Sequence, residues 1–207
     1  MVNSTYSGLP KAQGLYSPAN EHDACGVGFI AHIKGAKSHA LIERALQILD
    51  NLTHRGATGY DSLLGDGAGI LLQIPDGLIR RECAKLAVVL PQAGDYAIGM
   101  MFLPQHAPSR AQCEQIIAKF VHSEGQVLLG WRDVPVDNRG LSEAAKHVEP
   151  VIRQVLIGRG DSCADTDAFE RKLFVIRKQV EHAVRAAKLE GGKQFYVPSL
   201  SARTVVY

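Results

Sequence analysis

The chain has 207 residues, of which 46% are hydrophobic and 21% charged, and its formal net charge is +2. These values are typical of a folded globular domain and exclude extended disorder, collagen-like repeats and coiled coil. The near balance of 23 basic and 21 acidic side chains gives no support for nucleic-acid binding, which requires a strongly basic face. No apolar run approaches the ~20 residues that span a bilayer, so we expect no membrane partner.

The first 24 residues are mostly small and polar, contain Pro10 and Pro18, and lack the apolar core of a secretory signal. We therefore expect a leader that is separate from the folded domain, and a cytoplasmic protein. The four cysteines are far apart in sequence and lack zinc-binding spacing, which argues against a disulfide scaffold and against structural zinc. They are Cys25, Cys83, Cys113 and Cys163.

The elements of the first half follow from periodicity and capping. Alternating apolar residues at 27–33 predict the first core strand. Ser38 is an N-cap candidate, and the apolar residues that follow it at helical spacing predict a helix that ends near residues 54–56. The next predicted elements are each bounded by Pro or Gly: strand 67–74, helix 76–86 and strand 96–103.

The second half also alternates between helices and strands. Ser109 followed by Gln112 predicts a capping box for a helix that Gly125 ends, and Asp167 with Glu170 predicts the start of a longer helix. The predicted strands here are 126–132, 151–157, 194–197 and 203–207. Six or seven strands, four long helices and no internal repeat indicate a mixed α/β or α+β fold with helices covering the sheets.

Cys25 is the first candidate for chemistry, because it stands directly after the leader at the start of the first predicted strand. Removal of the leader would place a thiol and a free α-amine on one residue. Their pKa values, about 8.5 and about 7.7–8, would let the amine take the proton of the thiol, as in hydrolases with an N-terminal threonine. Taken alone, a cysteine in this position is more often a small buried hydrophobic residue.

Arg55 is the second candidate and lies in the polar run 53–59, Thr-His-Arg-Gly-Ala-Thr-Gly. A guanidinium there could bind a substrate carboxylate through two parallel hydrogen bonds. The alternative is an ordinary helix end with favourable cations and a glycine stop. The glycine run at 65–69 does not fit a nucleotide loop, because it lacks the third glycine and leads into a strand, so it predicts a tight turn.

Together these motifs resemble the N-terminal region of glutamate synthase large subunits, which is a class II glutamine amidotransferase domain of the N-terminal nucleophile hydrolase family. The resemblance covers essentially the whole chain. It rests on Cys-Gly-Val-Gly-Phe from Cys25 and on the segments 54–61, 65–70, 130–135 and 194–201. It implies an α+β fold, a four-layer αββα sandwich, with residues 1–24 as a propeptide, Cys25 as the nucleophile and Arg55 as the clamp for the substrate carboxylate.

The resemblance also implies the reaction. L-Glutamine would be hydrolysed to glutamate and ammonia through a cysteinyl thioester, and the ammonia would be used with 2-oxoglutarate and reductant to make glutamate. The family enzyme uses FMN and an iron–sulfur cluster, neither of which is expected in this segment. The implied partners are the rest of the large subunit, with its FMN synthase domain, and an electron-donating small subunit.

The sequence departs from the family pattern at one point, and this departure decides whether the chain is expected to be active by itself. The Asn-Gly oxyanion pair that the family places after a His-x-Arg-Phe-Ser-Thr type strand is not in this sequence. Residues 25–207 therefore resemble the first part of a glutaminase domain, incomplete at the C-terminus, with Val205 and Val206 on an uncovered strand edge. On this interpretation the isolated chain is inactive and marginally folded, acting at most as a folding or assembly module. A different amidase of the same hydrolase family, such as an acylase, is disfavoured because an apolar acyl group needs no Arg55.

Overall fold

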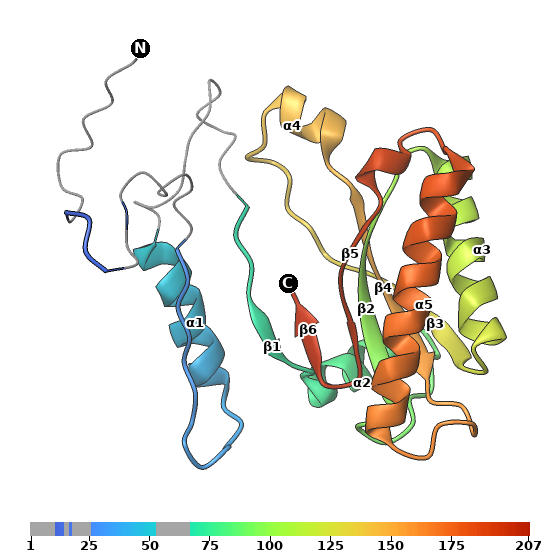
Figure 1. The fold of residues 1–207 in the computed structure, drawn as a ribbon, viewed down its shortest axis with the longest axis horizontal. Coiled ribbons are helices and arrows are strands. Elements are labelled where there is room, and N and C mark those ends of the chain that lie inside the picture. Colours follow the sequence, from blue (N-terminus) through green and yellow to red (C-terminus); the bar gives the residue numbers. More distant parts are fainter. Residues whose placement is uncertain (1–10, 15–16, 18–25, 53–66) are drawn as a thin grey trace. The chain divides into compact units, whose positions relative to one another are not determined.

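The computed structural model describes residues 11–14, 17, 26–52 and 67–207. The chain divides into two units, Met1–Ala68 and Gly69–Tyr207, and the second unit contains nearly all of the regular structure (Figure 1). Within the described ranges, no helix has both the length and the apolar character needed to cross a membrane.

The first unit contains helix α1, His39–Asn51. The Ser38 hydroxyl accepts a hydrogen bond from the backbone N–H of Ala40 at 3.2 Å, which satisfies one of the N–H groups that have no partner inside the helix. The predicted cap is thus confirmed, whereas the helix ends before the predicted residues 54–56. Its less exposed side consists of Ile42 and the predicted apolar stripe: Leu41, Ala45, Ile48, Leu49 and Leu52.

The strand predicted at 27–33 is wrong, because these residues form no strand. Val27, Phe29 and Ile33, the apolar members of the alternation, are 88%, 92% and 103% exposed. A strand exists only when a neighbouring backbone accepts and donates its hydrogen bonds, and no strand in the described part of the chain pairs with this segment. Residues 27–33 therefore have the alternating sequence pattern of a strand but, among the described residues, no neighbouring strand to pair with.

The second unit is built on a four-stranded antiparallel sheet with the order β3-β4-β2-β5. Its central strand, β2, spans Tyr96–Leu103 as predicted, and it pairs with β4, Val151–Gly158. The edge strands are β3, Val127–Asp133, and β5, Tyr196–Ser201. The strand predicted at 194–197 is confirmed at residues 196 and 197 and wrong at its start, because Gly192–Gln194 forms a 3₁₀ turn.

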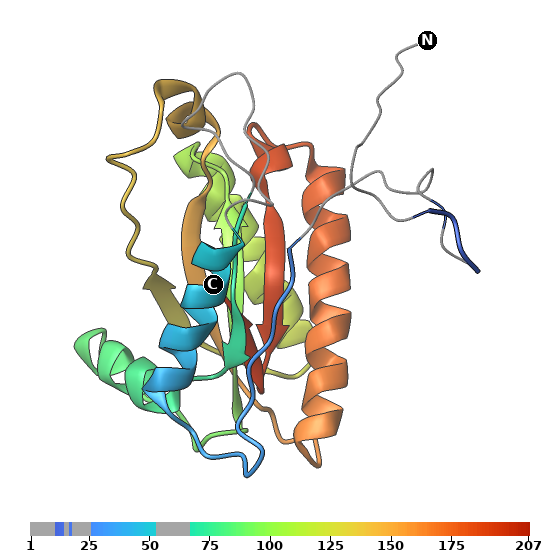
Figure 2. The ribbon, with the colours of Figure 1, turned by 90° about the vertical axis from the view of Figure 1, so that its left-hand side faces the viewer.

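Helices α3, Ala107–Ser123, and α5, Thr166–Ala187, cover one face of this sheet (Figures 1 and 2). Both helices present an apolar stripe to the alternate residues of β2 and β4. The first core contains fully or almost fully buried residues from all four elements, among them Met101, Leu103, Ile117, Val155, Phe169 and Leu173. These residues join the two helices to the sheet.

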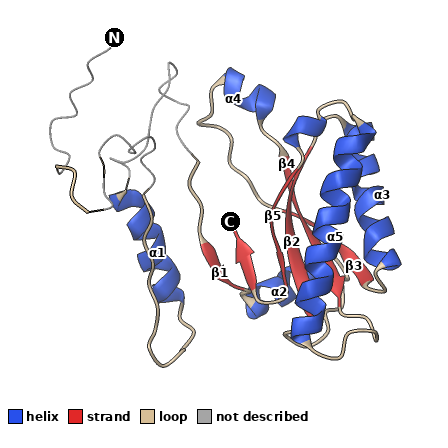
Figure 3. Ribbon diagram, in the orientation of Figure 1, coloured by secondary structure: helices blue, strands red, loops and turns tan. Residues whose placement is uncertain are grey.

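The opposite face of the sheet packs against α2, Asp76–Lys85, and a two-stranded sheet formed by β1, Leu71–Gln73, and β6, Thr204–Val206 (Figure 3). Strands β1 and β6 pair antiparallel, with Leu71 opposite Val206. Val205 is fully buried in the second core, beside Ile79 and Leu156. The expectation that Val205 lies on an uncovered surface is therefore wrong, and the fold is mixed α+β with antiparallel sheets.

Two helix starts differ from prediction. Helix α3 begins before Ser109, because Pro108 already occupies its first turn, where its missing N–H carries no penalty. The Ser109 hydroxyl instead lies 2.8 Å from Nδ1 of His106. The N-cap of α5 is Asp165, whose carboxylate accepts from the N–H of Ala168 at 2.7 Å, so Asp167 lies inside the helix. The short helix α4, Glu143–Val148, was not predicted at all.

Candidate functional site

Both residues that the sequence nominates, Cys25 and Arg55, lie outside the described residues. The structure does describe their neighbours along the chain: Gly26 directly follows Cys25, and Leu52 lies three residues before Arg55. The described geometry therefore concerns the framework that leads into and out of the candidate site.

The glycines after Cys25 pack closely against the end of α1. A Cβ atom placed on Gly28 would lie 2.5 Å from Cγ2 of Ile48, and one placed on Gly26 would lie 3.0 Å from Cδ2 of Leu52. The first distance is shorter than a carbon–carbon contact allows, so only glycine lets the backbone approach Ile48 this closely. The structure thus brings together the residue after Cys25 and the helix end that precedes Arg55.

A tight turn returns the chain from this segment to α1. The N–H of Gly35 donates to the carbonyl oxygen of His32 at 2.8 Å, and Gly35 has a φ of +67°, a conformation that glycine adopts at little cost. The N–H of Ala36 donates to Nδ1 of His32 at 3.2 Å. The turn reverses the chain so that Gly26 and Gly28 lie alongside the helix that follows them.

The run that contains Arg55 rejoins the described chain at Gly67, two residues before a second close approach. A Cβ atom on Gly69 would lie 3.0 Å from the carbonyl oxygen of Tyr207. Ile70 and Tyr207 exchange two backbone hydrogen bonds, of 2.7 and 2.9 Å, which extend the pairing of β1 with β6. The described part of the glycine run at 65–69 therefore provides a close backbone approach, and residues 65 and 66 of the predicted turn lie outside the described residues.

Tyr207 is held in turn by a chain of buried polar side chains. Nε2 of Gln154 donates to the Tyr207 hydroxyl at 2.9 Å, and Nη1 of Arg132 donates to Oε1 of Gln154 at 3.0 Å. Nη2 of Arg132 lies 3.9 Å from a carboxylate oxygen of Glu82. Gln154 is fully buried and Arg132 is 8% exposed. These hydrogen bonds fix the Tyr207 side chain, and the backbone pairing of Tyr207 with Ile70 in turn fixes the backbone at Ile70.

Sequence reasoning missed this polar chain, although one signal for it is present. Strand alternation places Gln154 on the same face of β4 as Ile152 and Leu156, so a polar amide occupies a core position. A buried amide requires partners for its donors and its acceptor, so the sequence signals a polar network at this position, and the structure identifies its members as Arg132 and Tyr207.

The sequence from Cys25 onward matches a known family. The model for class-II glutamine amidotransferases matches residues 25–207, so the match begins at Cys25 itself. The chain belongs to the class II glutamine amidotransferases. The resemblance seen in the sequence motifs is confirmed by this match.

Curated relatives of this amidotransferase chain are glutamate synthases. The chain is 45% identical over 203 residues to "Glutamate synthase [NADPH] large chain" of Bacillus subtilis, covering 98% of this chain and 13% of the relative. It is 41% identical to "Glutamate synthase [NADH]" of Schizosaccharomyces pombe, covering 99% of this chain and 10% of the relative. It is 37% identical to "Ferredoxin-dependent glutamate synthase 2" of Synechocystis, covering 100% of this chain and 13% of the relative. The chain thus spans about a tenth of the length of these relatives.

The other cysteines of the amidotransferase chain lie in buried environments, and those of Cys83 and Cys113 disfavour the thiolate. Cys83, Cys113 and Cys163 are buried and free. Burial raises the pKa of the Cys83 thiol, and it raises the pKa of Cys113 to about 11. Because the thiolate is the reactive form, these environments oppose nucleophilic chemistry at neutral pH.

The described residues also do not fit an iron–sulfur cluster. Cys113 and Cys163 belong to the first core and Cys83 to the second, whereas cluster ligation needs several thiolates around one point. Within the described ranges, no three His, Cys, Asp or Glu side chains gather in a metal-binding group.

Proposed function

We propose that this chain forms part of a glutaminase domain that hydrolyses L-glutamine to glutamate and ammonia, with Cys25 as the nucleophile. The observation that carries the proposal is the family match over residues 25–207, which starts at Cys25. The buried, unactivated state of Cys83 and Cys113 supports the same choice. The N-terminal nucleophile hydrolase sandwich of four layers is the fold that we propose for the complete domain.

The proposed reaction begins with removal of residues 1–24, which gives Cys25 a free α-amine. The amine takes the thiol proton, and the thiolate attacks the side-chain amide carbon of glutamine, forming a C–S bond and a tetrahedral oxyanion. Collapse of the oxyanion breaks the C–N bond, and ammonia leaves with the proton from the α-ammonium group. Water then adds to the thioester, the C–S bond breaks, and glutamate and the thiol are released.

Arg55 is proposed to bind the α-carboxylate of glutamine through two parallel hydrogen bonds. The packing of Gly26 against Leu52 supports this assignment, because it holds the neighbours of the nucleophile and of the arginine in contact. A guanidinium in this role binds the substrate equally well before and during the reaction, so it contributes mainly to affinity.

In the complete protein, the ammonia is proposed to be used with 2-oxoglutarate and reductant to make glutamate. The names of the relatives, which combine glutamate synthase with NADPH or NADH, support the product and the need for a reductant. We place FMN, the iron–sulfur cluster and the contact with an electron-donating small subunit in parts of that protein beyond this chain. The reaction is proposed to take place in the cytoplasm, on the composition of the first 24 residues.

The first experiment uses the full-length protein and Cys25→Ala. We expect loss of glutamine-dependent glutamate synthesis with retention of ammonia-dependent synthesis, because only the first reaction needs the thioester. Cys113→Ala is the matched control and should retain both activities. Intact-mass measurement should show a chain that begins at Cys25. Glutaminase activity in Cys25→Ala, or an active enzyme that still carries residues 1–24, would overturn the proposed mechanism.

The second experiment tests Arg55 in the same protein. Arg55→Lys should raise KM for glutamine roughly tenfold or more while kcat changes much less, because lysine offers a point charge in place of two parallel donors. Arg44→Lys, at an exposed position of α1, is the matched control. A fall in kcat with unchanged KM would contradict the carboxylate clamp.

The alternative of a module without turnover is tested on residues 25–207 alone. We expect no measurable glutamate release, because the loss of one oxyanion donor already costs about 100- to 1,000-fold in turnover and the family's Asn-Gly pair is not in this sequence. Turnover near that of the full-length protein would show that a residue of this chain supplies the oxyanion site.

A further inference from the structure

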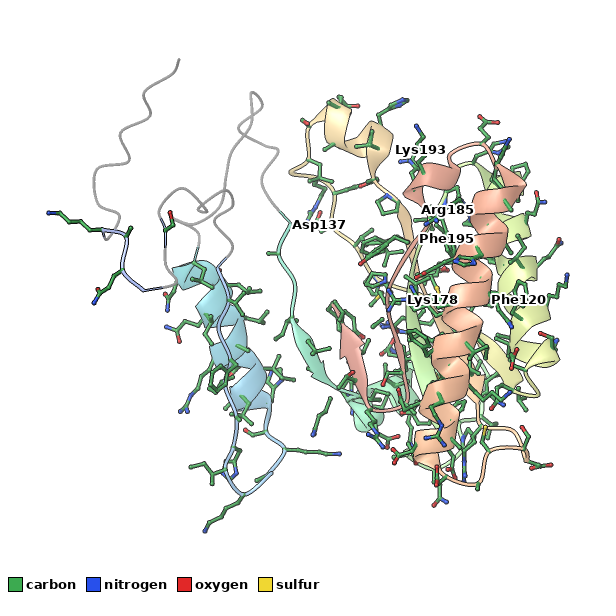
Figure 4. The ribbon with its side chains drawn as sticks, in the orientation of Figure 1. Phe120, Asp137, Lys178, Arg185, Lys193 and Phe195 are labelled. Atoms are coloured by element: carbon green, nitrogen blue, oxygen red, sulfur yellow. The ribbon has the colours of Figure 1, made fainter. Side chains whose placement is uncertain are left out.

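A groove of about 770 Å³ lies between the second half of α5 and the start of β5. We call it the α5–β5 groove. Lys178 and Arg185 of α5, Lys193 of the 3₁₀ turn and Phe195 just before β5 lie along it (Figure 4). The groove belongs entirely to the second unit and uses none of the residues assigned to glutamine hydrolysis.

Basic side chains are concentrated in this groove. Five of the chain's 23 Lys and Arg residues but one of its 21 Asp and Glu residues line it, which leaves 18 basic and 20 acidic side chains elsewhere. The single carboxylate, Glu181, already accepts hydrogen bonds from Arg177 at 2.8 Å and Lys178 at 3.1 Å. Within the described residues, no carboxylate pairs with the three remaining basic residues: Arg185, Lys188 and Lys193.

The groove also offers apolar and aromatic surface next to these charges. Phe195 is half-buried and packs against the first core, and Val184 and Leu189 contribute aliphatic lining. Arginine and aromatic side chains such as phenylalanine are enriched at protein–protein interfaces. A ligand that carries only phosphates would leave this apolar part of the lining without a partner.

The length of the groove favours an extended chain over a compact molecule. Its lining on α5 runs from Arg177 to Leu189, which at 1.5 Å per residue is about 18 Å. An extended polypeptide rises about 3.3 Å per residue, so five or six residues would span the groove. Strand addition to β5 is disfavoured, because Pro198 in this edge strand has no N–H to donate, so binding relies on side chains.

We propose that the α5–β5 groove binds an extended acidic segment of a partner polypeptide. Carboxylates of the segment pair with Arg185, Lys188 and Lys193, and an apolar side chain of the segment packs on Phe195. Charge complementarity of this kind mainly governs partner choice and association rate. The inference does not depend on glutamine hydrolysis, so either can fail without the other.

The test measures the fluorescence anisotropy of a short labelled peptide of glutamates interrupted by phenylalanines, mixed with the full chain. The groove variant is Arg185→Glu with Lys193→Glu. The matched control, with the same change in charge, is Arg81→Glu with Lys119→Glu, two exposed positions outside the groove. Circular dichroism checks that all variants fold, and Arg185→Gln with Lys193→Gln replaces the groove variant if the charge reversal unfolds the chain.

We expect the groove variant to bind the peptide roughly tenfold or more weakly, the control to bind within about twofold, and added salt to weaken binding. A peptide with glutamine in place of glutamate should not bind. Equal losses in both variants, or no binding to the unmodified chain, would overturn the proposal. Groove-dependent binding of a single-stranded oligonucleotide that is tighter than that of the peptide would also overturn it, in favour of a nucleic-acid surface.

Discussion

The two faces of the four-stranded sheet are filled in different ways. Toward α3 and α5 the interior is hydrophobic, and its buried polar side chains, Ser109 and Gln126, lie near the ends of α3. Toward α2 and β6, a hydrogen-bonded chain through Arg132 and Gln154 crosses the interior. One face is thus closed mainly by apolar area, with its buried polar side chains near the ends of α3, and the other by apolar area together with a polar network that crosses it.

These two ways respond differently to the loss of one side chain. A hydrophobic core loses stability in proportion to the apolar contact and the cavity volume involved. A buried polar network loses stability because each removed partner leaves another group without a hydrogen bond. A substitution on each face therefore tests separately whether lost apolar packing or a lost hydrogen-bond partner lowers the stability.

The largest effect is expected on the hydrophobic face. Phe169 of α5 is fully buried in the first core, so Phe169→Ala should lower the free energy of unfolding by about 3–5 kcal/mol. Urea denaturation of the 207-residue chain measures it. Phe174→Ala, at a site on the same helix that is 61% exposed, should change stability by less than about 0.5 kcal/mol. Comparable losses at both positions would mean that α5 does not pack as described.

A smaller effect is expected on the polar face. Gln154→Leu keeps a side chain of similar size but leaves Arg132 and the Tyr207 hydroxyl without their partner, so the free energy of unfolding should fall by about 1–3 kcal/mol. Gln115→Leu, at an exposed position of α3, serves as the control. An unchanged or higher stability of Gln154→Leu would show that the network contributes no net stabilisation.

The smallest effect concerns the polar contacts between α3 and α5. Lys172 and Gln179 of α5 both donate to Glu124 at the end of α3, at 2.8 Å, and these hydrogen bonds hold the pKa of Glu124 below its usual value. A depressed pKa in the folded state gives stability that is present above the unfolded-state pKa, near 4.5, and is lost as pH falls through the lower folded value.

Glu124→Gln should therefore destabilise the chain by less than about 1 kcal/mol at neutral pH and by progressively less below about pH 4.5. Urea titrations at a series of pH values measure the difference between the two proteins. Asp161→Asn, at an exposed position, should show no such convergence. A difference that grows as the pH falls would contradict the assigned sign.

Elements with strong local signals were predictable from the sequence. Strand β2 and the Ser38 cap were found because apolar patterning and cap chemistry agree at these positions. The start of α3 was misplaced because Ser109 and Gln112 satisfy the capping-box pattern inside a helix, where Pro108 was the better signal. The predicted strand 194–197 ends before Pro198, whereas β5 runs through this proline to Ser201, as an edge strand can.

Other features depend on contacts between residues far apart in sequence. Gln154 has the expected alternation, but its partners become visible only when β4 is placed beside β3, which carries Arg132, and beside Tyr207, which directly follows β6. The strand expected at 27–33 failed for the same reason, since its alternation says nothing of a pairing partner. For the candidate site, Cys25 and Arg55 came from motifs, and the packing of Gly26 on Leu52 came from the structure.

The pairing of β1 with β6 also sets the order of events during synthesis. Leu71 and Val206 are paired but stand about 135 positions apart, so β1 leaves the ribosome long before its partner. At roughly 5–20 residues per second, the interval lasts on the order of 7–27 s. During this time β1 and the apolar residues of the second core are available to chaperones. The first core also includes Ala202 and the second Val205, so neither core can be complete before the last residues of this unit have been synthesised.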